Sequence, residues 1–449
     1  MFAMNISKSP IGIMKATFIV LGALALSGCV TAERRISVAD YRDKMAAGWI
    51  GQIAGVGLGG PTEFKYSYKP VPPERVRAWS PEIINEAFNQ DDLYVEMTFL
   101  RTLETKGLGV GIREAGIDFA NSRYRLWHAN AEGRNNLRRG IAPPDSAHPA
   151  NNGCANCIDY QIEADYSGLV SPGLPQGAVD LGETFGRLMN SGDGLYAGQF
   201  VGALYSAAFF ESDPEAIVRE ALRAIPAESR YAEMVRDCLK WHAEKPDDWK
   251  YGFDKIIAAY GHEKDYNGVS CAVLPNVIEA TLNGAMVLLG VLWGDGDLDK
   301  TIRYSCYGGF DSDCNPSTAG GVIFTTKGLK ALPKAYVEKL DRVTKFEYTD
   351  YNFDNLVDVC EKIAREVVVK SGGRVVREKD GEWFVLPVKA PVPSPLESFT
   401  KPRPLVGARY TEAECARILF RPDDPKTDLS TRWGIGSTPK PASGRSSDR

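Results

Sequence analysis

Apolar residues recur at helical spacing through most of the chain. One such face is formed by Leu93, Met97, Leu100 and Leu103. The segment 214–225 repeats the pattern, and the run 280–293 is apolar all round and rich in small residues, which indicates a helix buried on every side. Clear alternation of apolar and polar residues is absent from 38–370. The pattern therefore predicts an all-α fold over this range.

The helical pattern breaks in two places. Segment 122–180 is rich in Pro, Gly and Asn and has no regular period, so it predicts a long irregular loop of the kind that often carries function. Residues 374–386 form two short apolar runs around an Asp-Gly pair, which predicts a β-hairpin. We expect a hairpin-containing appendage over 371–423 and, from its Ser, Pro and Lys content, a disordered tail over 424–449.

The first residues are typical of an export signal. Lys15 precedes the apolar run 16–25, and Leu26-Ser27-Gly28-Cys29 follows. This resembles the cleavage box of a bacterial lipoprotein, in which the cysteine is lipidated and becomes the first residue. A plain signal peptide or a short membrane anchor is the alternative, although the run is short for spanning a bilayer. We expect a signal peptide at 1–28, a helical domain over 29–370, and lipidation at Cys29.

Charge and composition narrow the list of partners. The formal charge of the 449-residue chain is -5, and removing residues 1–28 takes Lys8 and Lys15 away to give -5 - 2 = -7. No basic stripe stands out, which argues against nucleic acid as a partner. Val30 after the cysteine favours a lipid anchor on the periplasmic face of the outer membrane. The remaining partner class is a small-molecule or glycan substrate; the sequence leaves the oligomeric state open.

Two acidic pairs are the strongest chemical signal. Asp311 and Asp313 lie in a turn-forming segment, and Asp91 with Asp92 stands at another junction between loop and helix. Brought together, they would form the all-oxygen pocket that hard divalent cations need. A glycine-rich stretch from Ala46 also ends at a carboxylate, Glu63; glycines within a helix are tolerated where another backbone or a ligand approaches closely.

Three blocks in this order resemble the ADP-ribosylglycohydrolase family: the glycine helix ending at Glu63, the block 89–92, and Gly309-Phe310-Asp311-Ser312-Asp313. The resemblance covers about residues 39–335. It implies an all-α orthogonal helical bundle with a pair of Mg²⁺ ions in a central cleft, Mn²⁺ or Ca²⁺ being the alternative ions. It further implies Asp91, Asp92, Asp311 and Asp313 as metal ligands, and Glu63, Asp92 and Asp313 as catalytic residues.

Other positions depart from the family pattern or extend it. Gln90 stands where the family usually has Thr, Val56 replaces an Asp, and Cys314 stands where the family has Thr or Ser. A cysteine is a poor ligand for hard Mg²⁺, which leaves open whether one ion or two is bound. We assign substrate binding to Asp165, Asp193, Gln90 and Cys314. For Asp165 and Asp193, helix capping or a turn hydrogen bond is the competing interpretation.

The resemblance implies a metal-dependent hydrolase of a glycosidic bond. Removal of ADP-ribosyl groups is the activity of the family, but we expect an exported lipoprotein to meet an envelope glycan, a sugar nucleotide or a related sugar. The alternative is a non-catalytic sugar- or nucleotide-binding lipoprotein that retains the cleft, which Gln90, Val56 and Cys314 favour. The leaving group, the stereochemical outcome and the state of Cys154 and Cys157 stay open.

Overall fold

The computed structural model describes Met1 and residues 32–261 and 277–422. Apart from Met1, the predicted signal peptide at 1–28, the lipidation residue Cys29 and the tail at 424–449 lie outside the described residues. Within the described ranges, no helix is both long enough and apolar enough to cross a bilayer.

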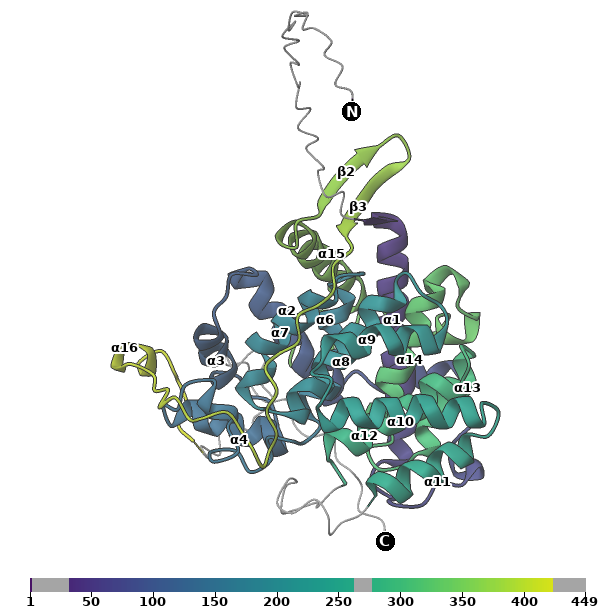
Figure 1. Cartoon of the computed structure of the whole chain (residues 1–449), viewed down its shortest axis with the longest axis horizontal. Helices are drawn as coiled ribbons and strands as arrows, with labels where there is room; N and C mark the ends of the chain where they lie inside the picture. The colour runs from purple at the N-terminus through teal and green to yellow at the C-terminus, as the bar shows by residue number, and fades with distance from the viewer. Residues whose placement is uncertain (2–31, 262–276, 423–449) are drawn as a thin grey trace, which may run out of the picture.

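The described chain is mostly helical, which confirms the predicted all-α bundle (Figure 1). The helices of the first half are α1 (Val38–Gly59), α2 (Asp91–Lys106), α3 (Ile112–Ala120), α4 (His128–Arg138), α5 (Asp159–Ile162), α6 (Asp165–Leu169), α7 (Pro175–Thr184) and α8 (Asp193–Ala208). Those of the second half are α9 (Pro214–Ala221), α10 (Arg230–Glu244), α11 (Trp249–Tyr260), α12 (Ala280–Trp293), α13 (Leu298–Tyr307), α14 (Cys314–Lys327), α15 (Phe353–Lys370) and α16 (Glu412–Cys415).

A small antiparallel sheet stands at one end of the bundle (Figure 1). Its strands are β1 (Glu33–Ser37), β2 (Arg374–Glu378) and β3 (Gly381–Pro387), in the order β1-β3-β2. The β2–β3 hairpin was predicted, but β1 was not, since its sequence is short and mostly charged. It is held by pairing with β3, Arg35 lying opposite Val385, and by burial of Ile36.

The glycine-rich helix α1 packs backbone to backbone against α14. Gly51, Gly55 and Gly59 are spaced one turn apart; the first two face α14, and Gly59 faces the turn that precedes it. A Cβ atom at Gly55 would lie 2.2 Å from the carbonyl oxygen of Pro316, and its three nearest atoms would all belong to the backbone. At Gly59 a Cβ would lie 1.8 Å from the carbonyl oxygen of Ser312. The glycines thus let α1 approach the segment that carries the second acidic pair.

The prediction of a long irregular loop over 122–180 is wrong. The structure places α4, α5, α6 and part of α7 there, and most of the region is buried. Helices α5 and α6 have only four and five residues. Elements this short give no readable period and are stabilised by tertiary contacts rather than by intrinsic propensity.

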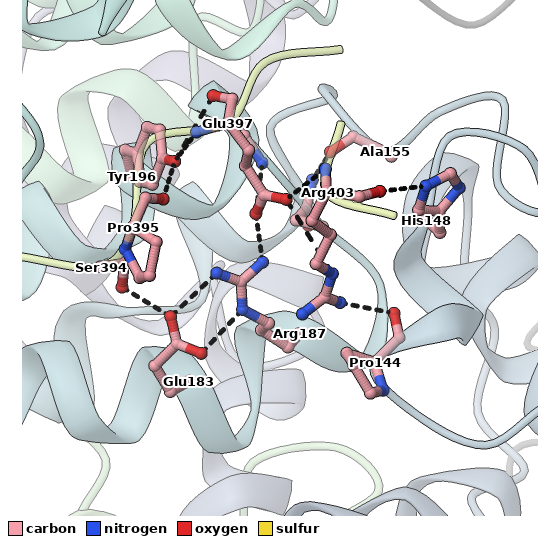
Figure 2. Close-up of polar contacts among 12 residues, drawn as sticks. Pro144, His148, Ala155, Glu183, Arg187, Tyr196, Ser394, Pro395, Glu397 and Arg403 are labelled. Atoms are coloured by element: carbon pink, nitrogen blue, oxygen red, sulfur yellow. Dashed lines mark hydrogen bonds and ion pairs between the residues drawn. The ribbon is translucent and has the colours of Figure 1, made fainter. Parts of the chain in front are cut away.

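Residues 388–411, which we call the C-terminal strap, run from β3 across the helical bundle to α16 (Figure 1). The strap is fastened by a buried polar network, drawn in Figure 2. Glu397 forms an ion pair with Arg187, their side chains being 5% and 4% exposed. Tyr196 on α8 donates its hydroxyl to the carbonyl oxygen of Pro395 at 2.7 Å and accepts the backbone N–H of Glu397 at 2.8 Å.

Candidate metal centre

Three backbone segments meet at the candidate site: the loop after α1, the start of α2 and the turn before α14. The first and third are tied directly. Phe64 donates its N–H to the carbonyl oxygen of Phe310 at 2.9 Å, and Phe310 donates to that of Tyr66 at 2.8 Å. Both Phe64 and Phe310 adopt positive φ angles of 51° and 57°. Such angles cost energy for non-glycine residues and persist where the surroundings enforce them.

Side chains fix the same turn from two other directions. The hydroxyls of Thr62 and Ser312 lie 2.8 Å apart, which joins the end of α1 to the acidic turn. From α12, the side-chain oxygen of Asn283 accepts the backbone N–H of Asp311 at 3.3 Å and the side-chain amide of Asn315 at 2.9 Å. The carboxylates therefore stand on a turn with little freedom to move.

The structure brings the predicted carboxylates together in two ligand groups, except Asp91, which belongs to neither. Glu63, Asp311 and Asp313 each offer an oxygen within 4.8 Å of the others. In the second group, oxygens of Asp92 and Asp313 and the sulfur of Cys314 satisfy the same limit. Asp313 belongs to both groups, so two adjacent positions could each hold a cation.

The buried oxygens of these groups lack protein donors. Both carboxylate oxygens of Asp92 and one oxygen each of Asp311 and Asp313 are buried without a hydrogen-bond partner. Unpartnered buried polar groups are costly, so such oxygens call for a ligand. Burial, followed by repulsion from Asp313, raises the pKa of Asp92 and of Asp311 well above the usual range. A divalent cation would satisfy both the oxygens and the charge, and the donor set fits one.

Glu63 and Asp91 form the outer edge of the cluster. Glu63 is solvent-exposed and Asp91 is half-buried, whereas Asp92, Asp311 and Asp313 lie beneath the surface. Desolvation and then the charges of Asp313 and Asp91 raise the pKa of Glu63 to about 7. Desolvation and Asp313 raise the pKa of Asp91 to about 6. The predicted ligands and Glu63 thus make one electrostatically coupled cluster that opens to solvent at Glu63.

A second layer of buried acids lies behind Asp92. Burial raises the pKa of Asp165 to about 7, and Asp165 accepts a hydrogen bond from the Thr318 hydroxyl at 3.4 Å. The sequence analysis did not identify Glu96. It lies one turn after Asp92 on α2, and this i, i+4 spacing was the signal that placed both acids on one face. Glu96 accepts the backbone N–H of Tyr166 at 2.7 Å, and its other oxygen is unpartnered.

Asp193 and Gln90 make other contacts. Asp193 accepts the backbone N–H of Tyr231 at 3.0 Å, in the first turn of α10, and the charges that act on it are those of Glu279 and Arg230. This is a capping geometry between two helices. Gln90 precedes α2 and donates its amide to Asn89 at 3.1 Å. Their predicted contacts with substrate stay predictions.

Comparison with known proteins identifies the family of the chain. A family model described as ADP-ribosylglycohydrolase matches residues 37–371. A solved structure described as an ADP-ribosylglycohydrolase-related protein complex shares 15% identity and covers 73% of this chain and 99% of its own. Its TM-score is 0.46, a similarity too low to inform function. No curated protein matches the chain.

Proposed function

The chain belongs to the ADP-ribosylglycohydrolase family, and on that premise we propose that it is a metal-dependent hydrolase that cleaves a glycosidic bond. Family membership supports a hydrolase of this type. The observation that carries the metal requirement is the pair of ligand groups that share Asp313, with buried carboxylate oxygens that no protein donor satisfies.

The residues divide the chemical work between them. Asp91, Asp92, Asp311 and Asp313 would hold the divalent cations, Mg²⁺ first among them. A bound cation supplies Lewis acidity, orients neighbouring sugar hydroxyls and lowers the pKa of a coordinated water. Glu63 stands at the solvent edge, where a sugar would enter. Its pKa of about 7 places proton exchange near neutral pH. Positive charge nearby would lower that pKa and favour the carboxylate, the form that accepts a proton.

We further propose that the protein is exported and anchored by a lipid at Cys29. The support is the sequence Leu26-Ser27-Gly28-Cys29. Strand β1 begins shortly after it, at Glu33, so an anchor would hold the sheet end of the molecule near the membrane. Helix α1 leads from that sheet to the candidate site, and its 22 residues span about 33 Å. The site would therefore face away from the membrane, toward soluble or wall-borne sugars.

This placement shapes the substrate proposal. ADP-ribosyl groups on bacterial proteins are mostly intracellular, so an anchored enzyme is better suited to a glycan fragment, an exported sugar nucleotide or a related glycoside. The exposed position of Glu63 above buried carboxylates suits a substrate that presents vicinal hydroxyls to the metal from the solvent side.

A hydrolysis screen with and without chelator tests the proposal. The panel contains aryl furanosides, aryl pyranosides, and ADP-ribosyl-arginine and ADP-ribosyl-serine conjugates. We expect turnover of at least one class, lost with chelator and restored by Mg²⁺ or Mn²⁺. Asp313→Asn should abolish it, whereas Asp254→Asn, an exposed position on α11, should not. Turnover that ignores both chelator and Asp313→Asn would refute the metal requirement.

One feature favours a second candidate, a binding protein without turnover. Cys314 places sulfur in the ligand cluster where the family has a hydroxyl. Calorimetry separates the two candidates. Metal binding to the wild type, lost in Asp313→Asn, combined with no turnover on the whole panel, would favour the binding protein.

A further inference from the structure

The two ligand groups differ in their chemistry. The group of Glu63, Asp311 and Asp313 offers only oxygen. The group of Asp92, Asp313 and Cys314 adds a thiol sulfur within 4.8 Å of both carboxylate oxygens. Hard cations such as Mg²⁺ and Ca²⁺ prefer oxygen, whereas thiolate ligands favour softer ions such as Zn²⁺. One position is therefore suited to a hard ion and its neighbour is not.

The sulfur-containing position is built into the interior. Cys314 is 4% exposed and Asp92 is 1% exposed, and both oxygens of Asp92 lack a protein partner. Cys314 is the first residue of α14, whose start is fixed by the close approach of α1 at Gly55 and Gly59. The backbone that carries the thiol thus cannot move away from the cluster without disturbing the contact between the two helices.

The other cysteines of the described chain lie outside the ligand groups. Cys238 lies 3.7 Å from the sulfur of Met234 in an apolar setting, and Cys415 is exposed on α16. Among the residues that the structure describes, Cys314 is the cysteine that shares a ligand group with carboxylates.

We propose that Asp92, Asp313 and Cys314 form a mixed oxygen and sulfur site that selects a Zn²⁺-like ion, and that Asp311 and Asp313 keep a hard ion beside it, next to Glu63. This inference rests on the proposed function, since it refines its metal centre. A thiolate ligand is bound without its proton, so occupation of this position releases the Cys314 proton and makes the sulfur the third negative ligand atom, beside Asp92 and Asp313.

Cobalt binding provides the direct test, because a thiolate bound to Co²⁺ gives a charge-transfer band in the near ultraviolet that oxygen ligands do not give. The full chain is freed of metal with chelator and titrated with Co²⁺, followed by absorption and by calorimetry. We expect the band in the wild type and in Cys415→Ser, which removes the exposed thiol. Cys314→Ser should still bind Co²⁺ but lack the band.

Ion preference provides the second readout. In Cys314→Ser, affinity for Zn²⁺ relative to Mg²⁺ should fall by at least about 10-fold, the lower end of what loss of even an outer-shell partner costs. Cys314→Thr, which is closer in volume, serves as a second variant if the serine variant misfolds, and circular dichroism checks both. If neither folds, a band that Cys415→Ser retains supports a buried thiol ligand, and the absence of a band in the wild type overturns the sulfur site.

The outcomes separate the two proposals. Binding of Co²⁺ to the wild type without a charge-transfer band overturns the sulfur site but leaves a metal-dependent hydrolase intact. A band that persists in Cys314→Ser and disappears in Cys415→Ser also overturns it. If the wild type binds no divalent ion by calorimetry, the metal requirement of the proposed function fails with it.

Discussion

Replacing Glu397 by Gln should release the C-terminal strap. The wild-type carboxylate is paired with Arg187, and both side chains are almost fully buried. It also accepts the backbone N–H of Arg403 at 3.3 Å and that of Gly192 at 3.4 Å. Glutamine keeps the shape and one acceptor oxygen but removes the charge. The strap then loses its main buried ion pair. Its remaining anchors are Ser394, which donates to Glu183, and the Ala408 N–H, which donates to Asp145.

The loss of stability depends on the partner that Arg187 keeps in the variant. Breaking a buried ion pair by removing one partner costs roughly 3–5 kcal/mol, because the other charge is left uncompensated. Here Glu183 still accepts from Arg187, at 2.7 Å and 3.0 Å. We therefore expect about 2–3 kcal/mol. With an unfolding entropy of about 0.8 kcal/mol/K for a chain of this size, that corresponds to a fall in Tm of roughly 3 °C.

Calorimetry gives the Tm, and trypsin, which can cut after Lys389 and Arg409, reports on the strap itself. Glu33→Gln is the control, since its pair with Arg374 is exposed to solvent and therefore contributes little to stability. The reasoning is refuted if Glu397→Gln melts and is cleaved like the control.

The pH dependence of cleavage supplies an independent check. Burial opposes ionisation of Glu397, but the charges of Arg187 and Arg403 prevail and hold its pKa below the usual range. A lowered pKa means that the stabilisation is present above the unfolded-state pKa and is lost as pH falls through the folded-state value. Acid should therefore expose the wild-type strap to an acid-active protease, and Glu397→Gln should not show this dependence.

Three further predictions concern the site. Gly55→Ala should destabilise the fold by about 1–3 kcal/mol and weaken metal binding, because the new methyl group would collide with the backbone of α14. The control is Gly60→Ala, whose methyl group would meet nothing within 4 Å, and thermal melts with and without Mg²⁺ distinguish the two variants. Asn283→Ala should weaken metal affinity about 10–100-fold by freeing the N–H of Asp311, as calorimetry would show; an unchanged affinity contradicts the positioning role. With chelator present, the free energy of unfolding should fall as pH rises from about 4.5 to about 7, because in this range the folded chain still holds the Glu63 proton that the unfolded chain has lost. Urea titrations measure this slope, and the same slope in Glu63→Gln would contradict the prediction.

The sequence predicted what depends on local pattern. Helical spacing revealed the bundle, and the Asp-Gly turn revealed the β2–β3 hairpin. The acidic residues were recognised because two carboxylates at helix starts suit a cation, and the structure places Asp92 and Asp313 in one group. Glu96 could have been added, since it follows Asp92 by one helical turn.

The remaining features depend on partners far away in the chain. Strand β1 has a charged sequence and forms because its backbone pairs with that of β3. Asn283 looks like an ordinary polar residue in an apolar helix until the turn at Asp311 is placed against it. The strap lacks any period, because long-range side-chain bonds such as Glu397 to Arg187 hold it. No local pattern encodes such contacts.

The same backbone contact that stabilises the fold also assembles the site, and this couples metal content to stability. The approach of α1 to α14 places Glu63 beside Asp313, and the raised pKa of each shows that the folded chain keeps repelling carboxylates together. An ion that binds only the folded state stabilises it by about 2.7 kcal/mol at 100 times its Kd. That gain is as large as the loss expected on releasing Glu397. The strap variant should therefore show its full defect in chelator and regain about the wild-type, metal-free Tm when Mg²⁺ saturates the site.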